Sequence, residues 1–297
     1  MNRITTITTA LALGLAFTAT ARAQGDDLEE VLVHDRARGE LSEGTGAPTQ
    51  EALMRAIGNG SPERLIATLE YGEHVECHAC VPLVERNLLG SDDAEVRRIS
   101  AWWLRHRVFA IAQIFHRMED VLASDADPVR RARAARAIGE FMLPAGLGAL
   151  QAAYGDESAE VREAVVLGLA RLNHSGANVT VAAALADADA AVRRAAIEVI
   201  NQLNFFRDTD ALVGALADDD AEVRTRAAYL VGQFRADGAE VALAGLLRSD
   251  ESVNVRQAAA IALGRLGTSA AREALVDARD RGDDSLVLDA IDVALRF

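Results

Sequence analysis

The residues best suited to chemistry lie in one short segment, His74-Val75-Glu76-Cys77-His78-Ala79-Cys80. It contains both cysteines of the 297-residue chain and two of its six histidines. A Cys-x-x-Cys spacing with neighbouring imidazoles is typical of zinc sites, and two nearby cysteines can also form a disulfide. Pro82 follows the segment and is expected to open a helix, so we place the segment in a loop.

Several chemical states of this segment are compatible with its sequence. A Cys77–Cys80 disulfide is favoured, because two lone cysteines in an oxidising compartment most simply pair with each other. A metal site made by the two histidines and two cysteines comes second, but the usual second ligand pair is not nearby in the sequence. A redox-active dithiol needs a βαβ context, and haem attachment needs a histidine directly after the second cysteine, where this chain has Val81. Two free thiols are the remaining state, and we expect no cofactor.

No motif of a known catalytic class accompanies the segment. The chain has no Gly-x-Ser-x-Gly, no phosphate-binding loop and no His-Glu-x-x-His. Paired acids such as Asp92-Asp93 resemble catalytic carboxylates, but equivalent acids recur along the chain, and we interpret them as helix-capping groups. No His-Glu pair recurs on successive helices at the other histidines, which are His34, His106, His116 and His174. We therefore predict that the chain is not an enzyme.

A sequence repeat predicts the elements that position these residues. Between residues 91 and 289 one pattern recurs every 31 to 34 residues, as in Ser-Asp-Asp-Ala-Glu-Val-Arg at 91–97 and Asp-Asp-Asp-Ala-Glu-Val-Arg at 218–224. A fixed period of this length is typical of a solenoid of stacked units. The usual valine of each copy, here called the anchor, falls at Val96, Arg130, Val161, Val192, Val223, Val255 and Val287.

Each copy contains the signals of a helix start. Three residues before the anchor the chain always has Asp or Ser, the residue types that cap a helix: Asp93, Asp127, Ser158, Asp189, Asp220, Ser252 and Asp284. Apolar residues then recur at helical spacing, and a second, shorter helix fits before each cap, for example at 211–216 and 241–247. Gly139, Gly232 and Gly264 stand where we expect these capped helices to end.

A column of arginines follows the anchors, beside columns of aspartates. Its members are Arg97, Arg131, Arg162, Arg193, Arg224 and Arg256, and five residues before each anchor stand Ser91, Asp125, Asp156, Asp187, Asp218 and Asp250. Repeated along a stack, these columns predict a ladder of ion pairs between neighbouring repeats. Solvated charges near helix starts are the alternative, since exposed pairs contribute only about 0–1 kcal/mol.

The pattern resembles HEAT-like repeats, especially the short subtype also found in phycobilin lyases. The resemblance rests on Asp-x-Asp/Ser-x-x-Val-Arg followed by Ala-Ala and Leu-Gly, best seen in residues 255–264, and it covers about residues 80 to 297. It implies that the capped helices line a concave face and that Asp–Arg pairs join the repeats. The similarity to the lyases is confined to the repeats.

The sequence as a whole predicts an all-α fold, an α-solenoid of about seven antiparallel helix pairs. Half of the residues are hydrophobic but only 4% are aromatic, as expected for closely packed helices. We divide the chain into a signal peptide (1–23), a mobile acidic leader (24–50), N-terminal capping helices with the Cys-x-x-Cys loop (51–90) and the repeat solenoid (91–297). Capping helices are expected at about 50–58 and 62–71.

The N-terminus and the charge balance predict where the protein acts. Arg3, an apolar run and Ala21-Arg22-Ala23 form a secretory signal, which predicts a periplasmic or secreted protein. No other segment has the length and apolarity of a membrane span. The formal net charge of −14 argues against nucleic-acid partners. The oligomeric state does not follow from the sequence.

One stretch of the acidic chain is basic. Residues 96–136 contain nine arginines and four acids, and also Trp102-Trp103, the only tryptophans. Positions two and six residues past an anchor share a helix face, so a partner-binding surface is expected at Arg98, Trp102, His106, Arg136 and, further along, Tyr229. In the alternative interpretation, one tryptophan packs against the N-terminal cap and the arginines face water.

These observations lead to two functional hypotheses. The first is a non-catalytic scaffold of the cell envelope that binds a protein or peptide partner, of acidic character, on its concave helical face. The second is an enzyme or enzyme subunit, lyase-like or dependent on a metal or redox group, centred on residues 74–80.

Overall fold

The described part of the chain, residues 49–297 of a computed structural model, is built from helices and contains no β-strand. The predicted signal at 1–23 and the predicted leader up to residue 48 lie outside these residues. The helices are α2 (Gln50–Asn59), α3 (Pro62–Tyr71), α4 (Val81–Gly90), α5 (Ala94–Arg105), α6 (Ile111–Ser124), α7 (Pro128–Phe141), α8 (Gly146–Ala153), α9 (Ala159–Leu172), α10 (Asn178–Ala184), α11 (Ala190–Val199), α12 (Thr209–Gly214), α13 (Ala221–Phe234), α14 (Glu240–Ser249), α15 (Val253–Leu266), α16 (Ser269–Arg281) and α17 (Ser285–Ala294).

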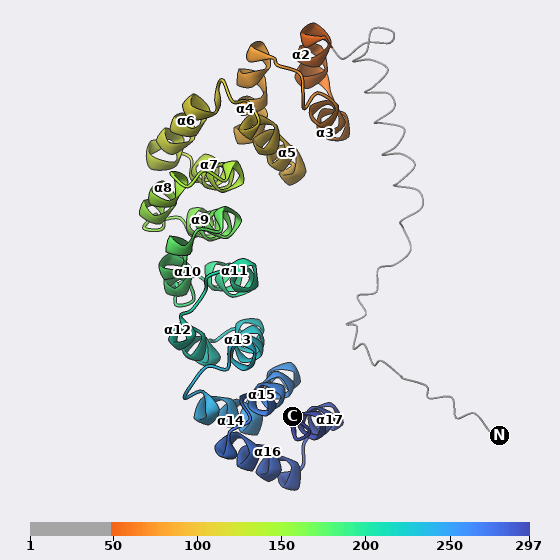
Figure 1. Cartoon of the computed structure of the whole chain (residues 1–297), viewed down its shortest axis with the longest axis vertical. Helices are drawn as coiled ribbons and strands as arrows, with labels where there is room; N and C mark the ends of the chain where they lie inside the picture. Colours follow the sequence, from red (N-terminus) through yellow and green to blue (C-terminus); the bar gives the residue numbers. More distant parts are fainter. Residues whose placement is uncertain (1–48) are drawn as a thin grey trace, which may run out of the picture.

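Helices adjacent in sequence pack as pairs, and the pairs stack into an arc (Figure 1). Seven pairs run from α4/α5 to α16/α17, and α2/α3 precede them. This confirms the predicted α-solenoid and the helices expected near 50–58 and 62–71. Because α4 packs on α5, the first pair begins at residue 81, ten residues before the first copy of the motif. The even-numbered helices from α6 onward form the outer layer, and the odd-numbered ones line the inner, concave side (Figure 1).

All seven predicted capping residues stand directly before an inner helix, which confirms the register of the repeat. Asp93, for example, accepts hydrogen bonds from the backbone N–H groups of Glu95 and Val96 at 2.8 and 3.0 Å. Ser158 and Ser252 occupy the capping position without a side-chain bond to the helix.

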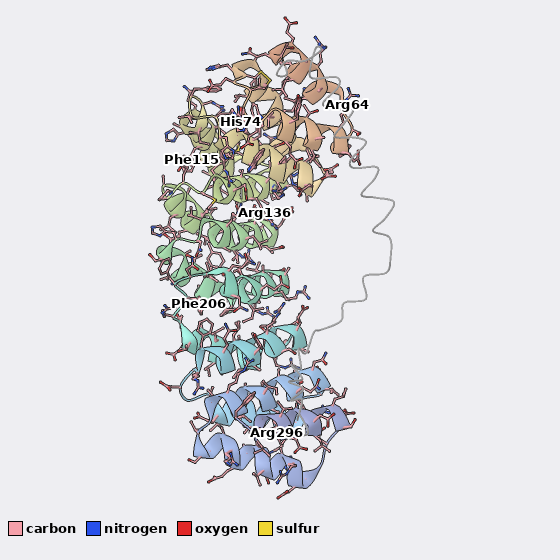
Figure 2. All side chains as sticks on the ribbon, turned by 45° about the vertical axis from the view of Figure 1, so that its right-hand side comes forward. Arg64, His74, Phe115, Arg136, Phe206 and Arg296 are labelled. Atoms are coloured by element: carbon pink, nitrogen blue, oxygen red, sulfur yellow. A yellow bond between two sulfur atoms is a disulfide. The ribbon has the colours of Figure 1, made fainter. Side chains whose placement is uncertain are left out.

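The anchors and the residues that follow them form the core between repeats. Six anchors are buried valines, whereas Arg130, the seventh, keeps its side chain half exposed. The core extends along the whole stack; Phe206, in its middle, is fully buried (Figure 2). Each repeat therefore buries its apolar stripe only against its neighbours, as the periodic pattern requires.

The glycines of the inner helices do not end them, which corrects the prediction for Gly139, Gly232 and Gly264. Helices α7, α13 and α15 each continue for two residues beyond these positions. A Cβ atom on Gly139 would lie 2.5 Å from the Cα of Gly168, and one on Gly264 would lie 2.7 Å from the carbonyl oxygen of Ala294. The glycines are needed because successive inner helices touch there, backbone against backbone.

The predicted ladder of ion pairs is present along five successive interfaces. Each arginine donates from Nε and Nη2 to the carboxylate of an aspartate in the following repeat, in the pairs Arg131–Asp156, Arg162–Asp187, Arg193–Asp218, Arg224–Asp250 and Arg256–Asp283. Two-point contacts of this kind between a guanidinium and a carboxylate are among the stronger charged hydrogen bonds.

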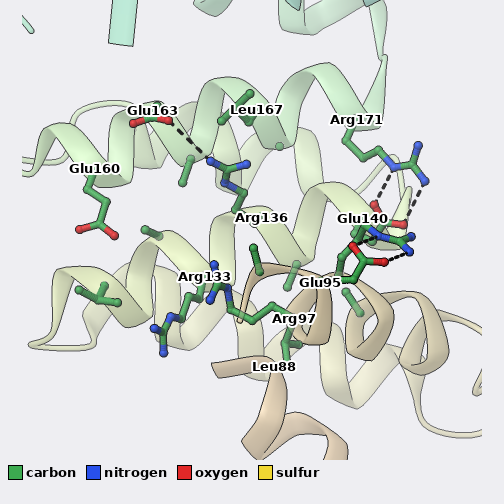
Figure 3. Close-up of a pocket in the computed structure, with 18 of the residues that line it drawn as sticks. Leu88, Glu95, Arg97, Arg133, Arg136, Glu140, Glu160, Glu163, Leu167 and Arg171 are labelled. Atoms are coloured by element: carbon green, nitrogen blue, oxygen red, sulfur yellow. Dashed lines mark hydrogen bonds and ion pairs between the residues drawn. The ribbon is translucent and has the colours of Figure 1, made fainter. Parts of the chain in front are cut away.

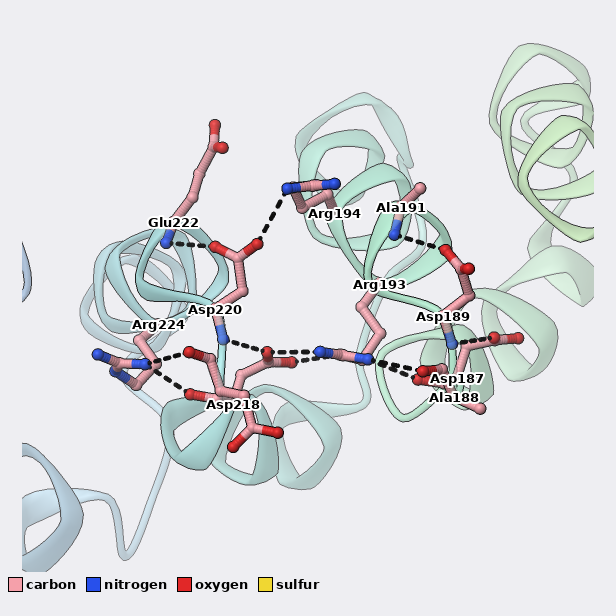
Figure 4. A network of polar contacts seen from close by, with 11 residues as sticks. Asp187, Ala188, Asp189, Ala191, Arg193, Arg194, Asp218, Asp220, Glu222 and Arg224 are labelled. Carbon is pink, nitrogen blue, oxygen red and sulfur yellow. Dashed lines mark hydrogen bonds and ion pairs between the residues drawn. The ribbon is translucent and has the colours of Figure 1, made fainter. Parts of the chain in front are cut away.

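A second set of bonds fixes each arginine within its own repeat. Nη1 of Arg193 donates to the carbonyl of Asp187 at 2.9 Å, while its other edge binds Asp218 (Figure 4). The aspartate also accepts a bond from the backbone two residues later, as Asp218 does from Asp220 at 2.8 Å. Each rung thus connects two repeats and orders the turn before the next inner helix.

Acidification is expected to weaken this ladder. Hydrogen bonds from Arg162 hold the pKa of Asp187 at about 2, below its ordinary value of 3.8. A carboxyl with a lowered folded-state pKa stabilises the fold above its unfolded pKa and loses that contribution as the pH falls toward 2. For Asp187, whose side chain is only 5% exposed, the loss between pH 5 and 2 amounts to about 2 kcal/mol.

Urea unfolding at pH 7, 4 and 2 measures this loss. Asp187→Asn cannot titrate at this position, so its free energy of unfolding should be lower at pH 7 and fall less toward pH 2. Parallel pH profiles for the two proteins would contradict the assignment.

The N-terminal end of the stack is tied to α5 through a loop and two side chains. Residues 72–77 lead from α3 into a 3₁₀ turn at His78–Cys80 and then into α4. Trp103 is fully buried and donates from its indole nitrogen to the carbonyl of Gly72 at 3.3 Å. Arg107, only 3% exposed, stacks 3.9 Å above the Trp103 ring and donates to the carbonyls of Glu73, Val75 and Trp103.

Candidate partner-binding cleft

A cleft of about 680 Å³ opens on the concave face, close to the N-terminal end. Residues of α4, α5, α7 and α9 line it, together with Asp92 and Gln202. Its wall alternates apolar positions such as Leu88, Ala101 and Leu167 with arginines and acids (Figure 3). It is an open recess between successive inner helices, a shape that suits a side chain or an extended segment of another molecule.

The predicted binding residues are distributed over three places. Arg98 on α5 and Arg136 on α7 both line the cleft. Trp102 lies one turn further along α5 and His106 follows the end of this helix; both are outside the cleft lining, with their rings edge to face at 5.0 Å. Tyr229 lies on α13, far along the stack, beneath the guanidinium of Arg265 at 4.8 Å.

The two tryptophans have different surroundings. Trp103 packs into the N-terminal end of the stack. This agrees with the alternative interpretation, in which one tryptophan packs against the N-terminal cap. Trp102 is partly buried and keeps an accessible face beside His106, whose Nδ1 lies 2.8 Å from the Trp102 carbonyl. Of the pair, Trp102 is therefore the one available to a partner.

Carboxylates pair with most arginines of the basic stretch at 96–136. Seven of the nine contact a carboxylate, in the pairs Arg98–Glu95, Arg105–Glu140, Arg117–Glu85, Arg130–Asp125, Arg131–Asp156, Arg133–Asp92 and Arg136–Glu163. Arg97 and Arg107 bind backbone carbonyls instead. Although this stretch has a positive net charge in the sequence, its arginines are therefore not free cations in the structure.

The contacts within the cleft differ in strength. Glu140 accepts hydrogen bonds from Arg171 at 2.6 and 3.0 Å and from Arg105 at 3.3 Å, which fixes one end of the cleft. Arg136 is held more loosely, 3.7 Å from Glu163, with 54% of its side chain exposed. The surrounding protein partly desolvates Arg136 and lowers its pKa. Arg136 is therefore well placed to exchange its contact for a partner's acid.

The segment at 74–80 does not converge on a common centre. Cys77 and Cys80 form a disulfide with an S–S distance of 2.12 Å and are both buried, in accord with the favoured state. The His74 side chain is 94% exposed beside Glu73, and His78 stacks on Phe109 with ring centroids 3.7 Å apart. Across residues 49–297 no three His, Cys, Asp or Glu side chains lie close enough to hold a metal ion.

The family of the chain follows from its sequence over most of the described stack. Residues 115–201, 148–232 and 209–296 match the family of HEAT repeats. The chain belongs to the HEAT-repeat family. The matched regions contain the capped inner helices from α7 to α17, so the assignment agrees with the stacking and with the ladder. The repeats before residue 115, which carry the cleft residues of α5, lie outside the matched regions.

Solved structures of other proteins are similar to this chain to different degrees. YibA of Escherichia coli matches with 18% identity and a TM-score of 0.58, over 90% of this chain and 97% of YibA. The CpcE–CpcF complex of phycocyanin lyase from a Nostoc species matches with 20% identity and a TM-score of 0.38, over 75% of this chain and 96% of that one. The likeness to YibA concerns the fold alone. No curated protein matches the sequence.

The described helices are too short or too polar to cross a membrane.

The predicted binding residues do not include Arg133, Glu163 and Arg171, which line the cleft from α7 and α9. In the sequence, these three residues are marked only by their position on the inner face of a capped helix. Many solvated residues share that position.

Proposed function

We propose that this HEAT-repeat protein is a non-catalytic scaffold of the cell envelope that holds a protein or peptide partner against its concave helical face. The open cleft between α5, α7 and α9 carries this proposal, because it presents exposed arginines and apolar positions on the inner face of the stack. Arginine and tryptophan are the residues that most often anchor protein interfaces. Trp102 lies one turn along α5 from Arg98 and extends the surface.

The placement in the envelope rests on the secretory signal predicted at 1–23. The Cys77–Cys80 disulfide supports it, since disulfides persist in oxidising compartments. The alternative of an enzyme centred on residues 74–80 would need reactive thiols or converging ligands, whereas both cysteines are paired and buried and the two histidines point to different neighbours. We therefore favour the scaffold.

Capture of the partner from an envelope extract tests the proposal. Trp102→Ala and Arg136→Ala should each weaken the affinity for the captured partner roughly tenfold or more, as expected for anchor residues. Arg248→Ala, which removes an exposed arginine of α14 outside the cleft, is the matched control and should bind as the wild type does. Circular dichroism establishes that all variants are folded. A wild-type protein that retains no partner, or variants that retain it unchanged, would remove the support for the scaffold.

A further inference from the structure

The ladder of ion pairs lacks one rung, at Arg97. In the five complete rungs the arginine binds carbonyls of its own repeat through Nη1 and a carboxylate of the next repeat through Nε and Nη2. Nη1 of Arg97 makes the first kind of contact, at 2.8 Å to the carbonyls of both Ser91 and Asp92. Among residues 49–297, its Nε and Nη2 have no acceptor. Arg97 therefore makes the contacts within its own repeat but lacks the contact with a carboxylate of the next repeat.

The acid that should complete this rung is used elsewhere. Asp125 occupies the equivalent position in the next repeat, but it accepts a hydrogen bond from Nε of Arg130 at 2.8 Å. Arg130 stands where six other repeats have a buried valine, and in this repeat the Asp125 carboxylate pairs with Arg130 and not with Arg97.

The surroundings of Arg97 favour an anion. Arg97 lines the cleft, and its guanidinium lies in the same part of it as those of Arg133 and Arg136 (Figure 3). Burial and the charge of Arg133 lower the pKa of Arg97, and Arg97 in turn lowers that of Arg136. The neighbouring acids offset this repulsion only in part, because Asp92 binds Arg133, Glu163 contacts Arg136 at 3.7 Å, and Asp93 caps α5.

Glu95 and Glu140 also line the cleft, but they bind Arg98 and Arg171. Glu160, a further acid of the lining, is exposed and acts on Arg97 through space without a hydrogen bond. A guanidinium edge with no acceptor, at the lining of the cleft and next to two further arginines, matches the paired oxygens of a carboxylate in geometry and charge.

We propose that an Asp or Glu side chain of the partner polypeptide binds the Nε–Nη2 edge of Arg97 and completes the missing rung. This inference rests on the proposed function, because it names the group that the concave face recognises. The partner carboxylate takes the position that an aspartate of the next repeat holds in every complete rung. Arg136 lies close enough to strengthen the same contact through its charge. Specificity then comes from a two-point contact that an amide or a single-point anion cannot reproduce.

Peptide binding to the full chain tests the inference without the natural partner. The probe is a fluorescein-labelled Gly-Ser-Asp-Asp-Ser-Gly peptide, compared with its Asn-Asn counterpart by fluorescence anisotropy at low salt. We expect the acidic peptide to bind and the amide peptide to bind at least tenfold more weakly. Arg97→Gln and Arg97→Lys should both reduce the affinity about tenfold, since lysine keeps the charge but loses the fork. Arg248→Gln removes the same charge outside the cleft and should have no effect.

The outcomes separate the possible explanations. Equal losses in Arg97→Gln and Arg248→Gln would reduce the effect to long-range charge and overturn the inference. Full affinity in Arg97→Lys, displacement of the peptide by an equal concentration of inorganic phosphate, or no binding of the acidic peptide would also overturn it. If the envelope partner is captured in a Trp102-dependent manner while these peptide results fail, the scaffold stands and the missing-rung inference falls.

Discussion

Gly139→Ala is expected to destabilise the solenoid by about 3 kcal/mol, a large loss for a single methyl group. The added Cβ would lie 2.5 Å from the Cα and carbonyl oxygen of Gly168, and these are backbone atoms that cannot rotate away. The contact is reciprocal, because a Cβ on Gly168 would lie 2.7 Å from the carbonyl oxygen of Ala135. Helices α7 and α9 would have to separate, and this would open the packing between two repeats.

Gly148→Ala is the matched control for this prediction. Gly148 is an exposed residue inside α8, and a Cβ there would meet no atom within 4 Å. Alanine should stabilise this position by up to about 1 kcal/mol, because it restricts the unfolded chain and favours a helix. Urea unfolding, with hydrogen exchange to locate the weakened repeats, should therefore show shifts of opposite sign. Equal effects of the two substitutions would disprove the close approach at Gly139.

The role of these glycines could not be predicted from the sequence alone. A glycine after a large apolar residue, as in Ile138-Gly139 and Leu263-Gly264, fits a helix end as well as a close contact between helices. Only the position of the next helix distinguishes the two interpretations. By contrast, the caps could be predicted because capping is local: the side chain at Asp93 bonds backbone groups two and three residues later. The helix starts, the pairing of helices and the stack therefore followed from the sequence.

The cleft could be predicted only in part. Arg98 and Arg136 were selected from their shared helix face, and both line it. Several of the acids that pair with this stretch are distant in sequence, as in Arg133–Asp92, 41 residues apart, and their alignment depends on how the repeats stack. The missing rung at Arg97 could not be predicted either, because Arg97 itself fits the repeat pattern. The visible departure from the pattern is in the next repeat, where Arg130 replaces the usual valine.

Arg107→Met is expected to cost about 3 kcal/mol and to release the loop that carries the disulfide. Arg107 is the buried cation that joins this loop to α5: it donates to the carbonyls of Glu73, Val75 and Trp103 and stacks on the Trp103 ring. Burial lowers the pKa of Arg107, and the charges of Glu76 and Glu73 offset this only in part. Methionine has a similar length but no donor, and each carbonyl left unsatisfied costs about 1–3 kcal/mol, offset in part because no buried charge remains.

The location of the damage distinguishes this role from a general loss of charge. Arg117→Met also removes one cation, but Arg117 is half exposed and paired with Glu85, so its effect should stay below about 1 kcal/mol. In Arg107→Met, hydrogen exchange should accelerate at residues 72–80 and in α2 and α3 while the C-terminal repeats keep their protection, because each repeat contacts only its neighbours. Arg107→Lys should lie between the wild type and methionine, since one ammonium can serve fewer of the three carbonyls. Uniform acceleration across all repeats, or none at the loop, would mean that Arg107 does not hold the N-terminal end of the stack.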